Sequence, residues 1–357
     1  MNKRFIKGMI LYALIFLLLS GAGLVLLWNF MDAYEQSRPI NAVKEYMESL
    51  TDEMIFDGSQ AFLSQLDTNL QTKDEAFEVI LNHLADELTY AKKGKESTAD
   101  RHVYILRSGT QPVGEIVISP TEPGKYGFSV WSVVEQTYDF SYLISEPVSI
   151  VVPSDFTVTA NGTPLNDGYI TQADIRYEAL EEFYDNMSLP TLVEYQFDSV
   201  LGEIELTVCD PDGDQVEVTE DTDYSALLKE CDFARIAQLN EFADGFLEAY
   251  VTFTGSANHS ANKNFSALSK YLINGSDLYD RLATAIHGLR FAQSYGDTIQ
   301  QINIHQLADV GNDRFYCDVT CVVETWGKAG AVETINNLKL IILDTQDGLK
   351  VEAMTRY

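Results

Sequence analysis

Basic side chains are scarce in this chain of 357 residues, which carries 24 lysines and arginines against 54 aspartates and glutamates. Proteins that bind nucleic acid gather Lys and Arg against the phosphates, so we expect no nucleic-acid partner. We interpret the net charge of −30 as a soluble, self-repelling surface rather than as a cation-binding device. A hydrophobic share of 46% excludes a disordered stalk.

Motifs that carry catalytic or metal chemistry are also missing. The five histidines show no short ligand spacing such as H-E-x-x-H, and no G-x-S-x-G elbow or G-x-x-x-x-G-K loop occurs. Asp210, Asp212 and Asp214 depart from a calcium-binding EF-hand, because Gly213 stands fourth in the cluster rather than sixth. We interpret this cluster as a hairpin turn. We therefore expect no cofactor and no metal site.

Only four cysteines are present, and neither pair has the C-x-x-C spacing of zinc or redox sites. Cys317 and Cys321 belong to an alternating run that puts both on one face of a strand, about 13 Å apart, which is too far for a disulfide. We expect both to be buried as small hydrophobic side chains. Cys209 and Cys231 flank an acidic segment, and a disulfide that closes this segment stays open as an alternative to free thiols.

One long apolar run, residues 9–31, predicts a membrane anchor. It contains no charged side chain and exceeds the length of about 20 residues that covers a bilayer core. It is longer than the apolar region of a signal peptide and no A-x-A site follows it, so we favour an uncleaved helix over a cleaved signal. The tail of residues 1–8 contains Lys3, Arg4 and Lys7, while every acidic residue follows the run. This asymmetry predicts a single crossing of the cell membrane, a cytoplasmic N-terminus and an extracellular bulk.

Two segments, 38–140 and 231–357, show the same order of patterns. Apolar residues first recur at helical spacing, and alternating, strand-like runs follow. Helices followed by antiparallel strands predict an α+β domain whose sheet wraps around its helices. We expect the helix that contains Val43 to be equivalent to the one that contains Phe246. The expected strands lie at about 87–93, 102–108, 112–119, 126–136, 298–307, 313–326, 332–344 and 349–356.

The chain between these segments is predicted to be all-β. Asn161 and Gly162 form the strongest short signal for a hairpin turn, and residues 193–197 alternate as in a strand. We predict a small β-sandwich over 145–218 with one short helix near 174–186. An acidic linker is expected at 219–230.

The order of helices and strands in the two α+β segments resembles the NTF2-like family of cone-shaped domains. The ending 348–354, Gly-Leu-Lys-Val-Glu-Ala-Met, is similar to the final strand of that family. With the anchor and the β-sandwich, the chain resembles extracytoplasmic proteins of Gram-positive bacterial envelopes. The modules of such proteins commonly bind partners or act as spacers. The resemblance implies a membrane-anchored binding or scaffold protein without catalysis. Its partners would be the lipid bilayer, through residues 9–31, and an unknown envelope protein or cell-wall ligand.

The same resemblance leaves a second function open, that of a small enzyme of the ketosteroid-isomerase type. Such an enzyme needs a carboxylate base in an apolar pocket beside an oxyanion donor such as Tyr. Asp318 and Tyr316 share one strand face and would be the candidates if that face lined the cone. For the binding function, we expect a cleft at the concave sheet surface. The expected lining is Tyr295, Tyr316 and Trp326, with Asp318 beside them.

Overall fold

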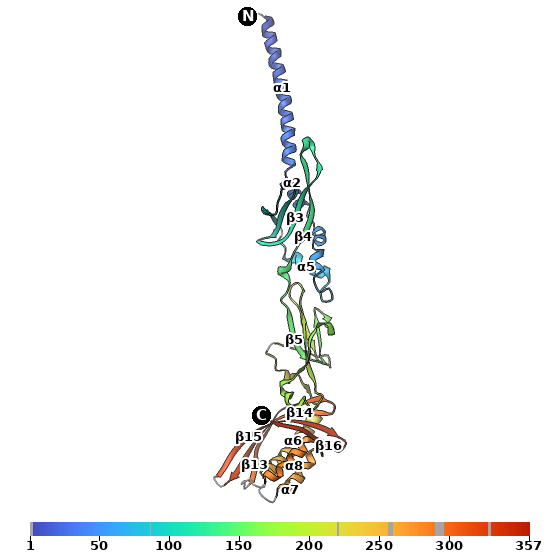
Figure 1. Cartoon of the computed structure of the whole chain (residues 1–357), viewed down its shortest axis with the longest axis vertical. Coiled ribbons are helices and arrows are strands. Elements are labelled where there is room, and N and C mark those ends of the chain that lie inside the picture. Colours follow the sequence, from blue (N-terminus) through green and yellow to red (C-terminus); the bar gives the residue numbers. More distant parts are fainter. Residues whose placement is uncertain (1–2, 86, 220, 256–259, 290–295, 328–329) are drawn as a thin grey trace. The chain divides into compact units, whose positions relative to one another are not determined.

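The computed structural model describes residues 3–357 except 86, 220, 256–259, 290–295 and 328–329 (Figure 1). Its contacts divide the chain into two compact units. The first unit comprises Met1–Val148, Thr159–Pro164 and Phe197–Thr207, and the second comprises Ser149–Val158, Leu165–Gln196 and Val208–Tyr357. The division passes within the predicted β-sandwich segment, which therefore contributes chain to both units.

The first unit begins with α1, a helix of 34 residues from Lys3 to Gln36. Within the described residues, α1 is the one helix long and apolar enough to cross a membrane, and its apolar stretch is 0% buried. At a rise of about 1.5 Å per residue, residues 9–31 extend over about 35 Å, close to the bilayer core of about 30 Å. The predicted apolar helix is confirmed, and it continues beyond the apolar run at both ends.

Four helices and a four-stranded antiparallel sheet follow α1 and form the proximal α+β domain. The helices are α2 (Pro39–Ser49), α3 (Asp52–Gly58), α4 (Gln60–Leu63) and α5 (Lys73–His83). The strands are β1 (Leu88–Lys92), β2 (His102–Ser108), β3 (Gln111–Pro123) and β4 (Ser129–Tyr138), paired in chain order. Pro39 begins α2 because its fixed φ and missing N–H suit a first helical turn. Thr72 and Glu75 form a capping box that begins α5.

The helices of the proximal domain cover one face of its sheet. Val43 and Ile80 from the helices and Leu106 and Ile116 from the strands are fully buried in one shared core. Such burial of large aliphatic side chains, at about 1.5–3 kcal/mol each, is what holds the short helices in place.

Two small sheets occupy the predicted β-sandwich segment. One has the order β5 (Val148–Pro153), β9 (Thr191–Phe197), β8 (Ile170–Arg176). The other has the order β11 (Gln215–Val216), β10 (Leu206–Cys209), β6 (Thr157–Ala160), β7 (Thr163–Pro164). The Asp210 carboxylate accepts hydrogen bonds from the N–H groups of Asp212 and Asp214, at 3.0 and 2.8 Å, which confirms a turn at this acidic cluster.

The helix predicted near 174–186 is wrong in its first part. Residues up to Arg176 belong to β8, which pairs with β9, and a 3₁₀ helix then covers Glu178–Phe183. Tyr177, Leu180 and Phe183 are all buried and recur every third residue. This spacing fits the 3.0 residues per turn of a 3₁₀ helix rather than the 3.6 of an α-helix.

The second unit contains the distal α+β domain, in which three helices precede a long antiparallel sheet (Figure 1). The helices are α6 (Phe233–Thr254), α7 (Ala261–Leu268) and α8 (Asp277–Leu289). The sheet has the order β12 (Lys229–Glu230), β13 (Gly296–Gly311), β14 (Arg314–Gly327), β15 (Gly330–Thr345), β16 (Gly348–Arg356). The predicted α+β fold class is confirmed, and the expected strands differ from the observed ones by a few residues at their ends.

The cysteines of the distal domain are core residues. Cys317 and Cys321 are fully buried in the core that the sheet shares with its helices, as the alternating pattern predicted. All four cysteines of the chain are free thiols, so the disulfide alternative for Cys209 and Cys231 is wrong. Cys231 packs in the distal core, which removes its thiol from the acidic segment.

The segment predicted as an acidic linker is partly built into the distal domain. Asp223 caps a 3₁₀ turn over Tyr224–Leu227, and Leu228 is buried. Strand β12 then pairs with β13 through Lys229 and Glu230. A strand of two residues is too short to show any periodicity. The acidic residues before β12 also made this segment read as a linker.

Candidate functional site

Of the predicted site residues, Tyr316 and Asp318 line one groove, whereas Trp326 lies apart from them. Tyr295 lies outside the described residues. Tyr316 and Trp326 are both on β14, and at about 3.3 Å per residue their positions are about 33 Å apart along the strand. Tyr316 is 1% exposed, whereas Trp326 is 50% exposed near the end of β14. One cleft cannot be lined by both rings.

Tyr316 and Asp318 lie on the sheet face that points away from the helices. Their neighbours Phe315, Cys317 and Val319 belong to the core shared with α6, and side chains alternate between the two faces of a strand. The isomerase candidates required that the face of Tyr316 and Asp318 line the helix-covered interior of the domain. That condition is not met.

A short segment of the second unit, residues 177–192, covers part of this outer face. Its apolar side chains pack with four residues of the distal sheet: Ala308, Val310, Tyr316 and Ile341. Tyr184 holds the segment together, since its hydroxyl donates to the Pro190 carbonyl at 2.6 Å and accepts from the Tyr177 N–H at 2.9 Å. Burial raises the pKa of the Tyr316 hydroxyl above its ordinary value, and the nearby Asp318 carboxylate adds to this effect.

A groove of about 600 Å³ opens beside the covered part of the outer face, and we call it the distal groove. Asp318, Lys339 and Tyr357 lie in it. Tyr357 donates a hydrogen bond of 2.8 Å to Asp318, and the Lys339 ammonium lies 5.1 Å from the centre of the Tyr357 ring. Burial of the Tyr357 hydroxyl raises its pKa, and the hydrogen bond that it donates to the Asp318 carboxylate raises the pKa further.

A second cation, Arg176 from β8, also lines the distal groove. Its guanidinium pairs with Glu181 at 3.0 Å and lies 5.2 Å from the centre of the Tyr184 ring. Both Arg176 and Lys339 are therefore held against aromatic rings, which fixes where their charges can meet a ligand.

A second groove, of about 750 Å³, joins the distal groove at Asp318. His305 of β13 lines it, and the Nε2 atom of the His305 ring lies 2.7 Å from the Thr320 hydroxyl. Thr320 in turn donates to Asn337 of β15 at 3.0 Å. The outer face thus changes from apolar at Tyr316 to a row of hydrogen-bonding groups across three strands. Such a surface suits a polar ligand.

Sequence reasoning identified Asp318 and missed Arg176, Lys339 and Tyr357. Lys339 interrupts the alternation between Leu338 and Leu340, which marks it as pointing to the opposite face from them. No local signal relates Arg176 to the distal sheet, because the two are joined only by the packing of residues 177–192.

No family model matches this chain, and no curated protein matches it. Among solved structures, the periplasmic domain of DotI is 12% identical, with 34% of this chain and 94% of that chain covered and a TM-score of 0.27. An IcmL-like type IV secretion system protein from Legionella pneumophila is 10% identical, with 36% of this chain and 94% of that chain covered and a TM-score of 0.28. An Ntf2-like protein involved in plasmid conjugation is 12% identical, with 88% of this chain and 97% of that chain covered and a TM-score of 0.24. Scores this low do not bear on the function.

Proposed function

We propose that this chain is a membrane-anchored scaffold or binding protein that presents its distal domain to a partner outside the cytoplasm. The observation that carries the proposal is α1, whose apolar stretch is 0% buried in the described chain. Exposed apolar surface costs about 25 cal/mol per Å² in water, and a bilayer removes it from water. The basic tail before α1 and the acidic bulk after it favour a cytoplasmic N-terminus.

The distal groove is the proposed binding surface. It holds two ring-supported cations, Arg176 and Lys339, in a chain whose net charge is −30. Glu178, Asp223 and Asp318 line the same groove, so its mixed charges favour a polar ligand that offers both hydroxyl and charged groups. An envelope protein or a cell-wall ligand offers such groups. The groove is proposed to bind without catalysis.

Protease treatment of intact cells tests the anchor and its orientation. With tags at both ends, the tag after Tyr357 should be lost, while the tag before Met1 should be protected. Edman sequencing of the purified protein should begin before the apolar run. A protected C-terminal tag, or a mature N-terminus near residue 24, would overturn the anchored topology.

The groove is tested separately by substitutions that leave the fold alone. Lys339→Gln should weaken the capture of crosslinked partners from native envelope material. Lys263→Gln is the matched control, because Lys263 is an exposed lysine on α7, outside the groove. Equal capture by both variants and the parent chain would remove the groove from the proposal and leave the anchor intact.

A further inference from the structure

Aromatic contacts hold the outer end of α1 against the hairpin between β3 and β4. The Phe30 ring lies 5.6 Å from the Tyr126 ring and 5.2 Å from the Phe128 ring, and the Tyr34 ring lies 5.6 Å from that of Phe128. All these residues belong to the first unit. The hairpin tip, residues 124–130, therefore lies beside the last apolar turns of α1.

The geometry of α1 sets the depth of the hairpin tip. The apolar run of about 35 Å fills a bilayer core of about 30 Å, so Phe30 lies at the outer boundary of the core. Tyr34 is about 6 Å further along the helix, in the headgroup layer. A ring that contacts Phe30 or Tyr34 lies at the same depth. Tyr126 and Phe128 are thus at the level of the lipid headgroups.

The side chains of the tip suit that layer. Tyr126 is 56% exposed and Val130 is 44% exposed, so the tip presents apolar surface that the described chain does not cover. Lys125 beside them is exposed. Aromatic residues gather at membrane interfaces, and a lysine can bury its stem there while its ammonium meets the lipid phosphates.

The backbone of the turn points the same way. Tyr126 has a φ of 58° and Gly127 a φ of 80°. A bulky side chain in this left-handed region is an outlier, and Asn or Gly would relax the turn. A tyrosine kept at a strained position indicates a use for its ring.

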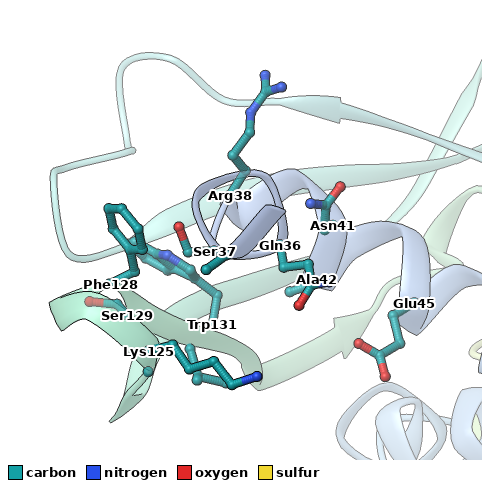
Figure 2. A pocket seen from close by; sticks show the side chains of 13 residues that line it. Gln36, Ser37, Arg38, Asn41, Ala42, Glu45, Lys125, Phe128, Ser129 and Trp131 are labelled. Carbon is teal, nitrogen blue, oxygen red and sulfur yellow. The ribbon is translucent and has the colours of Figure 1, made fainter. Parts of the chain in front are cut away.

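A groove of about 580 Å³ lies behind the tip, between the hairpin and the junction of α1 with α2. Phe128 and Trp131 of the hairpin and Ser37 and Arg38 of this junction line the groove (Figure 2). The hairpin and the helical junction are thus the two walls of a single surface at the outer end of α1.

We infer that the β3–β4 hairpin tip is a second membrane contact, seated in the phospholipid headgroup layer of the bilayer that α1 crosses. This inference rests on the proposed anchor function of α1. Two contacts fix the tilt of the proximal domain over the membrane, because a single helix leaves the chain free to rotate about its axis.

The test uses the full chain with Cys209→Ser, reconstituted in vesicles of phosphatidylcholine and phosphatidylglycerol. An environment-sensitive fluorophore is attached at Lys125→Cys, at Thr110→Cys or at Leu19→Cys. The acyl chains carry bromine quenchers near their ester ends for the first two labels, and near their methyl ends for Leu19→Cys, because Leu19 lies near the middle of the apolar run. Thr110 is the matched control, because it lies in the exposed turn at the other end of β3, a strand of 13 residues. The two turns are thus about 40 Å apart.

The label at Lys125→Cys should lose several-fold more emission to the quencher than the label at Thr110→Cys. Tyr126→Asn should reduce this loss without lowering the melting temperature, because Asn accepts the left-handed backbone. If the labels at Lys125→Cys and Thr110→Cys are quenched equally while Leu19→Cys is quenched strongly, the hairpin contact is wrong and the anchor stands. If Leu19→Cys is not quenched either, the anchor and the hairpin contact both fail.

Discussion

The proximal sheet, β1–β4, and the distal sheet, β12–β16, are each covered by helices on one face, and they differ on the other. The proximal outer face carries two ion pairs, Lys93–Glu115 and Arg101–Glu135, beside two buried valines that pair across β2 and β3, Val103 and Val117. The distal outer face buries Tyr316 and Ile341 under residues 177–192. The cover leaves an open groove where it stops, at Asp318. In such a domain, what packs on the outer face decides where a ligand can bind.

The helices of the two domains also meet different strands. Helix α2 contacts β3 and β4, at the end of the proximal sheet, whereas α6 contacts β13, the first long strand of the distal sheet. The expected equivalence of these two helices remains a prediction, to be tested by superposing the domains. A shared order of elements does not determine which strand each helix covers.

The largest expected effect breaks the covered face of the distal domain. Tyr316→Ala should lower the free energy of unfolding by about 3–5 kcal/mol, as for other large buried aromatic residues, because it leaves a cavity under residues 177–192. Trp326→Ala is the control, on the same strand and face but half exposed. Urea unfolding followed by far-UV circular dichroism measures both. A similar loss for the two would mean that the outer face is not covered at Tyr316.

The second prediction uses the fact that all cysteines lie in the second unit. Burial raises the pKa of Cys231 from 9.0 to about 11, and burial also raises that of Cys317 to about 12. Below pH 9 these thiols are protonated in both the folded and the unfolded chain, so they do not change the free energy of unfolding there. Above pH 9 the unfolded chain releases these protons first, and the distal domain should lose about 1.4 kcal/mol per pH unit for each thiol.

The proximal domain has no thiol, so the loss of its stability at high pH comes instead from its buried tyrosines. Burial raises the pKa values of Tyr46 and Tyr138, so this domain should lose stability only above pH 10. Melting curves between pH 8 and 11 should therefore show the distal transition falling first. Replacing Cys231, Cys317 and Cys321 by Ala should remove the lead of the distal transition, because burial raises the pKa of the Cys321 thiol as well. If the distal melting transition of that variant still falls at a lower pH than the proximal one, the thiols are not the cause of the difference.

Much of the fold could be predicted because its strands are long and alternate cleanly. The run around Cys317 and Cys321 fixed which residues of β14 face the helices, and the structure agrees. The order of helices before strands gave the α+β class of both domains. Short elements failed: β12 and the 3₁₀ helix at 178–183 hold too few residues for a period to emerge.

The candidate site could be predicted only in part, because a strand pattern separates two faces without saying which is covered. Tyr316 and Asp318 were correctly put on one face, but the sequence left open whether that face lines the helix-covered interior. Arg176 reaches the same groove from a strand far away in the chain, through packing that no local pattern encodes.

A third prediction compares tyrosine hydroxyls in the two domains. Tyr46 donates to Gln136 at 2.6 Å, which leaves Tyr138 as the donor in its 3.0 Å contact with Tyr46. Tyr138→Phe should therefore cost about 1 kcal/mol of unfolding free energy. Tyr316→Phe should cost less, since its hydroxyl has no hydrogen-bond partner among the described residues. A larger cost at Tyr316 would indicate a polar partner in the distal groove.

The smallest expected effect tests whether the proximal outer face is open to water. Arg101 and Glu135 are 3.5 Å apart and both side chains are about half exposed, at 47% and 64%. An ion pair in this setting is screened by water and salt, and holding two long side chains together costs entropy. Arg101→Ala should therefore change the unfolding free energy by less than about 1 kcal/mol, and a double-mutant cycle with Glu135→Ala should give a coupling that shrinks at high salt. A coupling of several kcal/mol that resists salt would mean that the proximal outer face is covered in the native protein, as the distal face is, and the contrast between the two sheets would be lost.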